Sequence, residues 1–331
     1  MSKRLSSYFK SLTDVNKANA RFVPRQFLEF LGKESIKDIK LGDQVQKEMT
    51  ILFSAGNSGF LPNTIGSPGN AKNVITVGAT ESYRPTWLDG CLIGSTSANN
   101  SNDIASFSSR GPTTDGRNKP DIVAPGTHIV GAATQITNYT GDYVCDQYYP
   151  VGQTLYAASS GTSHAAPAVA GAASLFYRYY KDHYDTTGSW PSPALTKAVI
   201  INSAKYLDGI SSGDTLPSPN QGYGSVNLGT AFDGLPWLFE DQTKILQNSG
   251  ESTTIRGYIS DSAQPLRITL AWTDAPGAVT GDAYVNDLNL RVEIGGITYL
   301  GNVFSGATSS SGGSADTRNN VESVFLPAGL Q

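Results

Sequence analysis

A run of small residues in the middle of the chain places the strongest constraint on the fold. Between Ser163 and Tyr180, alanine and glycine occupy positions at which a packed helix usually carries bulky side chains. These residues are Ala165, Ala166, Ala168, Ala170, Gly171, Ala172 and Ala173. Alanine favours helix, and small side chains let neighbouring elements approach the helix axis closely. We therefore expect a helix that runs through the middle of a domain, with close neighbours on nearly every side.

Short apolar segments on either side of this helix are typical of strands in a parallel sheet. They lie at Thr50–Phe53 and Val74–Val77, with a further short segment at Asp121–Val123 in a proline-rich loop region. Strands that helices cover on both faces have this nearly continuous apolar character. A second helix is predicted from Ser192 to Ala204. The alternation indicates an α/β fold with a parallel sheet and flanking helices.

The pattern changes after about Pro236 to alternating apolar and polar residues separated by turns. The alternating segments include Thr253–Ile259, Leu266–Trp272 and Leu288–Ile294. Such segments indicate an all-β module. The chain reaches Gln331 shortly after a further apolar segment, so we expect this module to be truncated.

The length of the chain allows two domains and a separate N-terminal segment. Residues 1–45 are rich in lysine and arginine and show no sustained hydrophobic period, so we expect short helices or partial disorder there. A helical stretch is expected at 41–49. We assign residues 46–235 to the α/β domain and residues 236–331 to the β module.

Charge and cysteine content narrow the classes of function. Only 16% of residues are charged and the net charge is −4, which argues against nucleic acid as a partner because such binders concentrate basic charge. Cys91 and Cys145 fit one disulfide in an oxidising compartment, and unpaired thiols fit equally well. The sequence after Met1 lacks the apolar core of a signal peptide, and no apolar run is long enough for a membrane anchor.

The segment Gly161–Pro167 is the most informative for function. Gly161 allows a tight turn, and Ser163 then opens a helix whose N-terminal amides and dipole can stabilise negative charge. Pro167 is tolerated because amides in the first turn lack partners within the helix. The pattern suits a serine nucleophile. The alternative is that Thr162 or Ser163 only caps a buried helix.

Four motifs in order resemble the subtilisin-like serine peptidases, the subtilase family. Gly161–Pro167 is similar to the segment around the catalytic serine of the family, and Ile51–Gly59 is similar to its oxyanion-hole strand. Ile104–Pro112 and Lys119–Gly126 are similar to the segments that precede the serine. The resemblance runs from residue 48 to residue 235 and implies a partial subtilisin-like sheet. The later segments are similar to the C-terminal, jelly-roll-like β-sandwich of certain bacterial and protist subtilases.

The resemblance implies catalytic roles for two residues. Ser163 would attack the carbonyl of a polypeptide substrate and form an acyl-enzyme, while the Asn57 side chain and the Ser163 amide hold the oxyanion. The alternative for Asn57 is a turn residue after a strand. The chemistry requires no cofactor, and the family implies a secreted or lumenal protein.

Subtilases of this kind often bind structural calcium, which makes calcium a candidate cofactor. Hard oxygen ligands could gather in the loops of the β module. The candidate ligands are Asp274, Asp282, Asp287 and Asp316. Solvated turn carboxylates are the alternative.

The aspartate and the histidine of the family precede its oxyanion-hole strand, and neither has a recognisable counterpart here. The histidines are His128, His164 and His183, all of them after Asn57. His164 adjoins Ser163, but consecutive helix residues point about 100° apart, so we interpret His164 as a packing residue. We interpret His128 and His183 as ordinary loop or surface histidines.

A serine hydroxyl is a weak nucleophile without a base, so the missing histidine leaves three accounts. The chain is an incomplete copy of a longer active peptidase, or it is a non-catalytic peptide-binding or regulatory pseudopeptidase. In the third account, a complementing chain donates the aspartate and the histidine.

Overall fold

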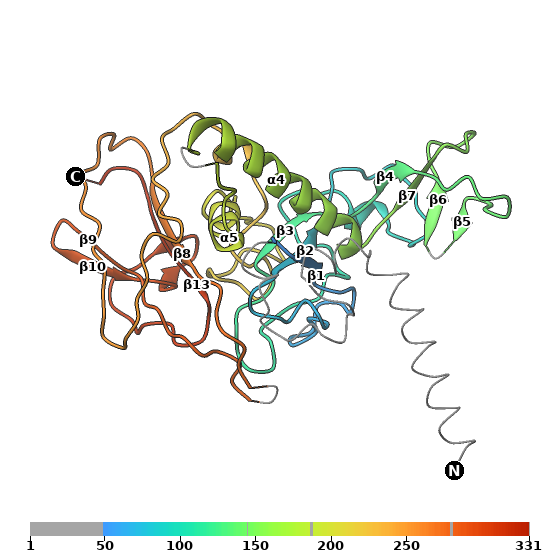
Figure 1. Ribbon diagram of the computed structural model, residues 1–331. Coiled ribbons are helices and arrows are strands. Elements are labelled where there is room, and N and C mark those ends of the chain that lie inside the picture. Colours follow the sequence, from blue (N-terminus) through green and yellow to red (C-terminus); the bar gives the residue numbers. More distant parts are fainter. Residues whose placement is uncertain (1–48, 144, 186–187, 279–280, 331) are drawn as a thin grey trace, which may run out of the picture. The chain divides into compact units, whose positions relative to one another are not determined.

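The computed structural model describes residues 49–330 apart from 144, 186–187 and 279–280 (Figure 1). The chain divides into two compact units, Met1–Met49 and Thr50–Gln331, and the features below belong to the second. The expectations for residues 1–45 and for a helix at 41–48 lie outside the described residues. The boundary proposed at residue 236 stays a prediction.

A three-stranded parallel sheet forms the centre of the α/β region. Its strands β1 (Leu52–Ser54), β2 (Ile75–Thr80) and β3 (Ile122–Pro125) lie in the order β1-β2-β3. Every residue of β2 is buried, as expected of a strand with a neighbour on each side. The predicted strands are confirmed, with bounds that shift by a few residues at their ends.

The long helix α4 (Thr162–His183) lies across this sheet and confirms the predicted helix (Figure 1). Its buried side, with Ala165 and Val169, packs in one core with Ile75 and Val77 of the sheet. The exposed residues of α4 include Ser163, Pro167, Ala168, Ala170, Gly171, Ser174 and Leu175. Close neighbours on nearly every side are therefore not found within the described part of the chain, because small residues permit close approach but do not enforce it.

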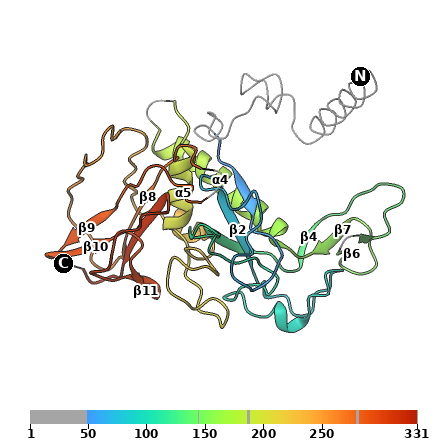
Figure 2. The same cartoon turned by 90° about the horizontal axis from the view of Figure 1, so that it is seen from below.

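Helix α5 (Pro193–Asn202) confirms the second predicted helix. The Ser192 side chain caps it by accepting a hydrogen bond from the Leu195 amide at 3.0 Å, and Pro193 stands in the first turn, where no helical donor is lost. Helix α5 contacts α4 and also lies beside strand β8 (Leu266–Ala271), as Figure 2 shows. The shorter helices are η2 (Ser95–Ser97) and α6 (Leu228–Ala231).

An antiparallel sheet separates β3 from α4 in the sequence. Its strands lie in the order β4-β7-β6-β5, with bounds β4 (Ile129–Ala132), β5 (Asp142–Tyr143), β6 (Asp146–Tyr148) and β7 (Tyr156–Ser159). A disulfide ties this sheet to the loop after β2, because Cys91 and Cys145 are bonded with their Cα atoms 4.2 Å apart. The pairing settles the alternatives that the sequence left open.

The C-terminal region contains several small antiparallel sheets. Strand β8 pairs with β13 (Val321–Leu326) over its full length, and every residue of β13 is buried. The other pairs are β9 (Arg291–Ile294) with β10 (Ile297–Leu300), and β11 (Phe304–Ser305) with β12 (Thr308–Ser309). The predicted strands near 266 and 291 are confirmed, and a complete β-sandwich stays a prediction.

The strand predicted at Thr253–Ile259 is wrong. The segment has no strand, and most of its residues, including Ile255 and Tyr258, are exposed. Alternation predicts a strand only when a second strand supplies its backbone partners. No described strand pairs with this segment.

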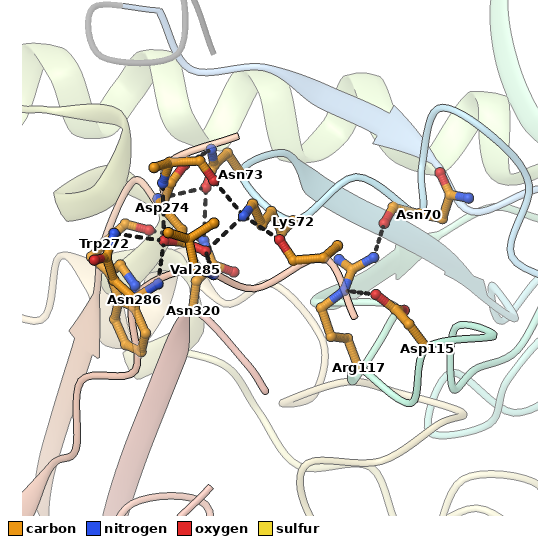
Figure 3. Close-up of polar contacts among 12 residues, drawn as sticks. Asn70, Lys72, Asn73, Asp115, Arg117, Trp272, Asp274, Val285, Asn286 and Asn320 are labelled. Carbon is orange, nitrogen blue, oxygen red and sulfur yellow. Dashed lines mark hydrogen bonds and ion pairs between the residues drawn. The ribbon is translucent and has the colours of Figure 1, made fainter. Parts of the chain in front are cut away.

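Hydrogen bonds join the C-terminal strands to the loop before β2 (Figure 3). The Lys72 ammonium group binds the Asp274 carboxylate at 2.7 Å, and it also donates to the Ala275 and Ala283 carbonyls. Asn73 exchanges two hydrogen bonds with the backbone of Asp274. The two regions therefore share a buried polar contact. Over the described residues, no helix is both long and apolar enough to span a membrane.

Candidate catalytic site

Ser163 lies in the first turn of α4, on the exposed side of the helix. Amides in the first turn of a helix have no partner four residues earlier, so their N–H groups are free to bind an anion. Within the described residues, the Ser163 hydroxyl makes no hydrogen bond. The helix terminus therefore offers an accessible hydroxyl, and its first turn suits the binding of an anion although the Thr162 and His164 amides already donate to Asn57 Oδ1 and to the Gly161 carbonyl.

Asn57 reaches the same helix terminus from the turn after β1. Its Oδ1 accepts hydrogen bonds from both the amide and the hydroxyl of Thr162, each at 2.9 Å. Two donors on one oxygen fix which end of the amide is Oδ1, so Nδ2 is the end that remains to donate. A Cβ atom placed on Gly161 would lie 3.3 Å from Asn57 Nδ2, so this donor faces the residue that precedes the helix.

Residues of two other motifs support the Asn57 turn. Gly56 has a φ of +108° and donates its amide to Thr162 Oγ1 at 3.2 Å. Ser109 Oγ accepts a hydrogen bond from the Ser58 amide at 3.0 Å, and the Ser109 amide donates to the Gly56 carbonyl. A Cβ on Gly56 would approach Ser109 Oγ to 2.9 Å, and a positive φ strains other residues, so glycine is required here.

Thr162 and Ser109 are site residues that the sequence analysis did not single out. Both lie inside motifs: Thr162 was named only as a possible helix cap, and Ser109 was not named individually. Their contacts explain why the motifs around residues 57, 109 and 162 occur together: each supplies hydrogen bonds to the same turn. The signal in the sequence was the motif itself and not any property of the single residue.

His128 lies in the loop between β3 and β4, as expected, but it is buried and is not an ordinary surface histidine. Its side chain is fully buried, and Nδ1 lies 3.1 Å from Asp89 Oδ2, which is also buried. Ser160 donates its hydroxyl hydrogen bond to the same carboxylate oxygen. The prediction failed because Asp89 lies far from His128 in the sequence and only the fold brings them together.

Among the described residues, the other two histidines, His164 and His183, also make no hydrogen bond to Ser163. His164 is half-buried, and burial holds its pKa below the ordinary value against the opposing charges of Asp89 and Asp146. His183 is exposed, and its ring stacks on Tyr179 with ring centroids 4.4 Å apart. Among the described residues, no histidine ring hydrogen-bonds the Ser163 hydroxyl.

The predicted calcium ligands do not gather into one site. Asp274 does not fit a cation because the Lys72 ammonium group and the amides of Val285 and Asn286 already occupy its carboxylate (Figure 3). Burial raises the pKa of Asp274, but these donors outweigh it and hold the pKa below its ordinary value. In the described part of the chain, no three acidic, histidine or cysteine residues are arranged to hold a metal ion, and calcium stays a prediction.

Asp287 and Asp316 lie in a second group of acids, together with Glu322. Burial, followed by the charge of Asp316, raises the pKa of Asp287. Burial also raises the pKa of Glu322 to about 8, although the Leu290 amide opposes the shift by donating to its carboxylate. The other Glu322 oxygen, Oε1, is buried with no hydrogen bond among the described residues.

Comparison with known proteins places these features in a family. The model of the subtilase family matches residues 29–224. Over 167 residues, the chain is 37% identical to the serine protease/ABC transporter B family protein tagD of Dictyostelium discoideum. This match covers 44% of this chain and 9% of tagD. Over 138 residues, the chain is 37% identical to the serine protease AprX of Bacillus subtilis. This match covers 40% of this chain and 27% of AprX.

Among solved structures, fervidolysin from Fervidobacterium pennivorans is similar at 18% identity and a TM-score of 0.36, over 84% of this chain and 30% of that chain. The chain spans 9%, 11% and 15% of the lengths of three Dictyostelium relatives, tagD, tagA and tagB. The family model covers more than half of the chain and includes all four motifs up to residue 167. The chain belongs to the subtilase family.

Proposed function

We propose that this chain forms the nucleophile and oxyanion half of a serine endopeptidase site, with Ser163 as nucleophile and Asn57 as oxyanion donor. The observation that carries the proposal is the pair of hydrogen bonds from Thr162 to Asn57 Oδ1. They hold the Asn57 side chain at the helix terminus that carries Ser163 and leave Nδ2 as the free donor. A residue that served only the turn would not need this orientation.

In the proposed reaction, the Ser163 hydroxyl oxygen attacks the carbonyl carbon of a peptide bond, and a base takes its proton. The negative charge that develops on the carbonyl oxygen is stabilised by Asn57 Nδ2 and by the Ser163 amide at the start of α4. The tetrahedral intermediate then expels the amine, which leaves with a proton from the base. Water hydrolyses the acyl-enzyme and regenerates the serine.

The base is the part of the site that the described residues do not supply. Among the described residues, none of the three histidines of the chain hydrogen-bonds the Ser163 hydroxyl, and residues 1–48 contain no histidine. We propose that a histidine and an aspartate reach Ser163 from other sequence, for example from a complementing polypeptide. Without them, the oxyanion donors alone leave on the order of 10³-fold catalysis over water.

Labelling with a fluorophosphonate probe tests the proposal, because the probe reacts with activated serines. Because the described residues supply no base, the folded chain should acquire one adduct, which mass spectrometry locates on Ser163, when a polypeptide that carries the histidine and the aspartate is added. The Ser163→Ala variant should acquire none. A folded chain that stays unlabelled, alone and with candidate partner chains, would overturn the catalytic proposal and favour a peptide-binding module.

A further inference from the structure

Two residues outside the four motifs, Asp89 and His128, lie next to the segment that leads into α4. Asp89 lies in the loop between β2 and β3, and its carboxylate is fully buried. Asp89 Oδ1 accepts the Cys91 amide at 3.0 Å, while Oδ2 accepts the Ser160 hydroxyl and lies 3.1 Å from His128 Nδ1. Asp89 therefore connects the disulfide loop, the start of β4 and the segment before the nucleophile.

Ser160 is held on both sides of its hydroxyl. It donates to Asp89, and its oxygen accepts the His128 amide at 2.8 Å. Its own amide points to Cys91 Sγ at 3.2 Å. The hydroxyl and the amide of Ser160 therefore both have partners in or near the Asp89 cluster. The position of Ser160 depends directly on the Asp89 carboxylate, to which its hydroxyl donates.

The anchors continue residue by residue to Ser163. The Gly161 amide donates to the Gly126 carbonyl at 2.8 Å, and the Thr162 amide donates to Asn57 Oδ1. Ser160, Gly161 and Thr162 are thus each fixed by at least one long-range contact. Among these three anchors, only that of Ser160 has a carboxyl side chain as its acceptor.

The contacts of Asp89 hold its side chain in place. His128 Nδ1 lies 3.1 Å from Asp89 Oδ2, and among the described residues neither ring nitrogen of His128 meets the geometry of a hydrogen bond. The charge of Asp89 is also felt by His164, the residue after the nucleophile. A buried carboxylate that lost these donors would be strongly destabilised, so the group resists displacement.

We propose that Asp89 is a positioning residue of the candidate catalytic site, acting through Ser160 to fix the backbone that presents Ser163. The proposal rests on the proposed function for its effect on reactivity, but the effect on the segment itself does not depend on that function. The Cys91–Cys145 disulfide forms the covalent support of the same arrangement, because Cys91 contacts both Asp89 and Ser160.

The test compares Asp89→Asn, which keeps an oxygen acceptor of the same shape, with Asp89→Leu, which removes it. Asp208→Leu, at an exposed aspartate, is the matched control. Hydrogen–deuterium exchange is followed in a peptide that spans residues 159–164, and folding is checked by the exchange of β8 and β13. Fluorophosphonate labelling, with a polypeptide that supplies the base present, is measured over a range of probe concentrations to separate probe affinity from the rate constant of reaction.

In Asp89→Leu we expect the amides of Gly161 and Thr162 to exchange about tenfold faster, because an anchoring hydrogen bond is lost. We expect the rate constant of labelling to fall by about 10- to 100-fold with unchanged probe affinity, because displacement of the nucleophile affects reaction more than binding. In Asp89→Asn, the exchange and labelling rates should both stay near their wild-type values. Asp208→Leu should match the wild type.

Unchanged exchange of residues 159–164 in Asp89→Leu would overturn the proposal, whatever the labelling shows. Faster exchange without rescue by Asp89→Asn would also overturn it, since the acceptor geometry would then be irrelevant. If the wild type is not labelled, the proposed function fails, and the exchange experiment still decides the role of Asp89.

Discussion

The sheet around Ser163 and the C-terminal region show opposite relations between sequence pattern and structure. In the sheet, each apolar run forms a strand because it pairs with a parallel neighbour and packs against α4. In the C-terminal region, Leu266–Ala271 formed a strand and Thr253–Ile259 did not, although both alternate. The difference is the partner, since β8 pairs with β13 along its whole length. A hydrophobic pattern is therefore sufficient evidence for a strand only where the partner is also present.

The largest expected effect on the free energy of unfolding comes from a substitution in the paired strands β8 and β13 of the C-terminal region. Phe325 of β13 is buried and packs with Tyr223 and Phe304, whereas Ile255 is 56% exposed. We expect Phe325→Ala to lower the free energy of unfolding by about 3–5 kcal/mol, from lost transfer energy and the cavity left behind. Ile255→Ala should change it by less than about 0.5 kcal/mol. Urea unfolding measures both, and equal losses would show that the 253–259 segment is packed after all.

A slightly smaller effect is expected where the two regions meet. Lys72→Met leaves the Asp274 carboxylate buried without its cation, while the Lys72 side chain itself is 10% exposed. We expect a loss of about 2–4 kcal/mol, a little below the usual value for a fully buried pair. Lys244→Met, at an exposed lysine, is the control.

The same contact predicts a pH dependence. The folded-state pKa of Asp274 lies below its ordinary value, so its stabilisation is present above the unfolded pKa and is lost as pH falls through the folded pKa. In the wild type, the free energy of unfolding should drop below about pH 4 more steeply than in the Asp274→Asn variant. Parallel acid limbs in the two proteins would contradict the assignment.

The smallest expected effect concerns Glu322, beside β9 and the acids Asp287 and Asp316. Burial raises its pKa to about 8, so the folded state holds a proton that the unfolded state releases near pH 4.5. Stability therefore decreases as pH rises between these values. Glu322→Gln should remove this decrease and gain roughly 1 kcal/mol at pH 8, an amount discounted for solvent screening. A destabilised variant at pH 8 would show that the carboxylate is needed in its charged form.

The sequence could predict the sheet strands, α4 and α5 because their signals are local: apolar runs, small residues and the Ser192 cap. It could also name Ser163 and Asn57 through motifs, and their catalytic roles stay predictions. It could not predict the contact between Asp89 and Ser160, which are separated by 71 residues. Neither residue has a local signature, and they meet beside a disulfide that spacing alone does not specify. The burial of His128 was missed for the same reason.

The central claim is that Asn57 and Ser163 act together at the start of α4, and the labelling rate of Asn57→Ala tests it most directly. An oxyanion donor is worth roughly 10² to 10³ in rate, a range that itself derives from a subtilase. With the base supplied by a complementing polypeptide, we predict that fluorophosphonate labels Ser163 in the wild type and that Asn57→Ala reacts slower by this factor. Asn138→Ala, at an exposed asparagine, should react like the wild type. Labelling of Asn57→Ala at the wild-type rate would contradict the account.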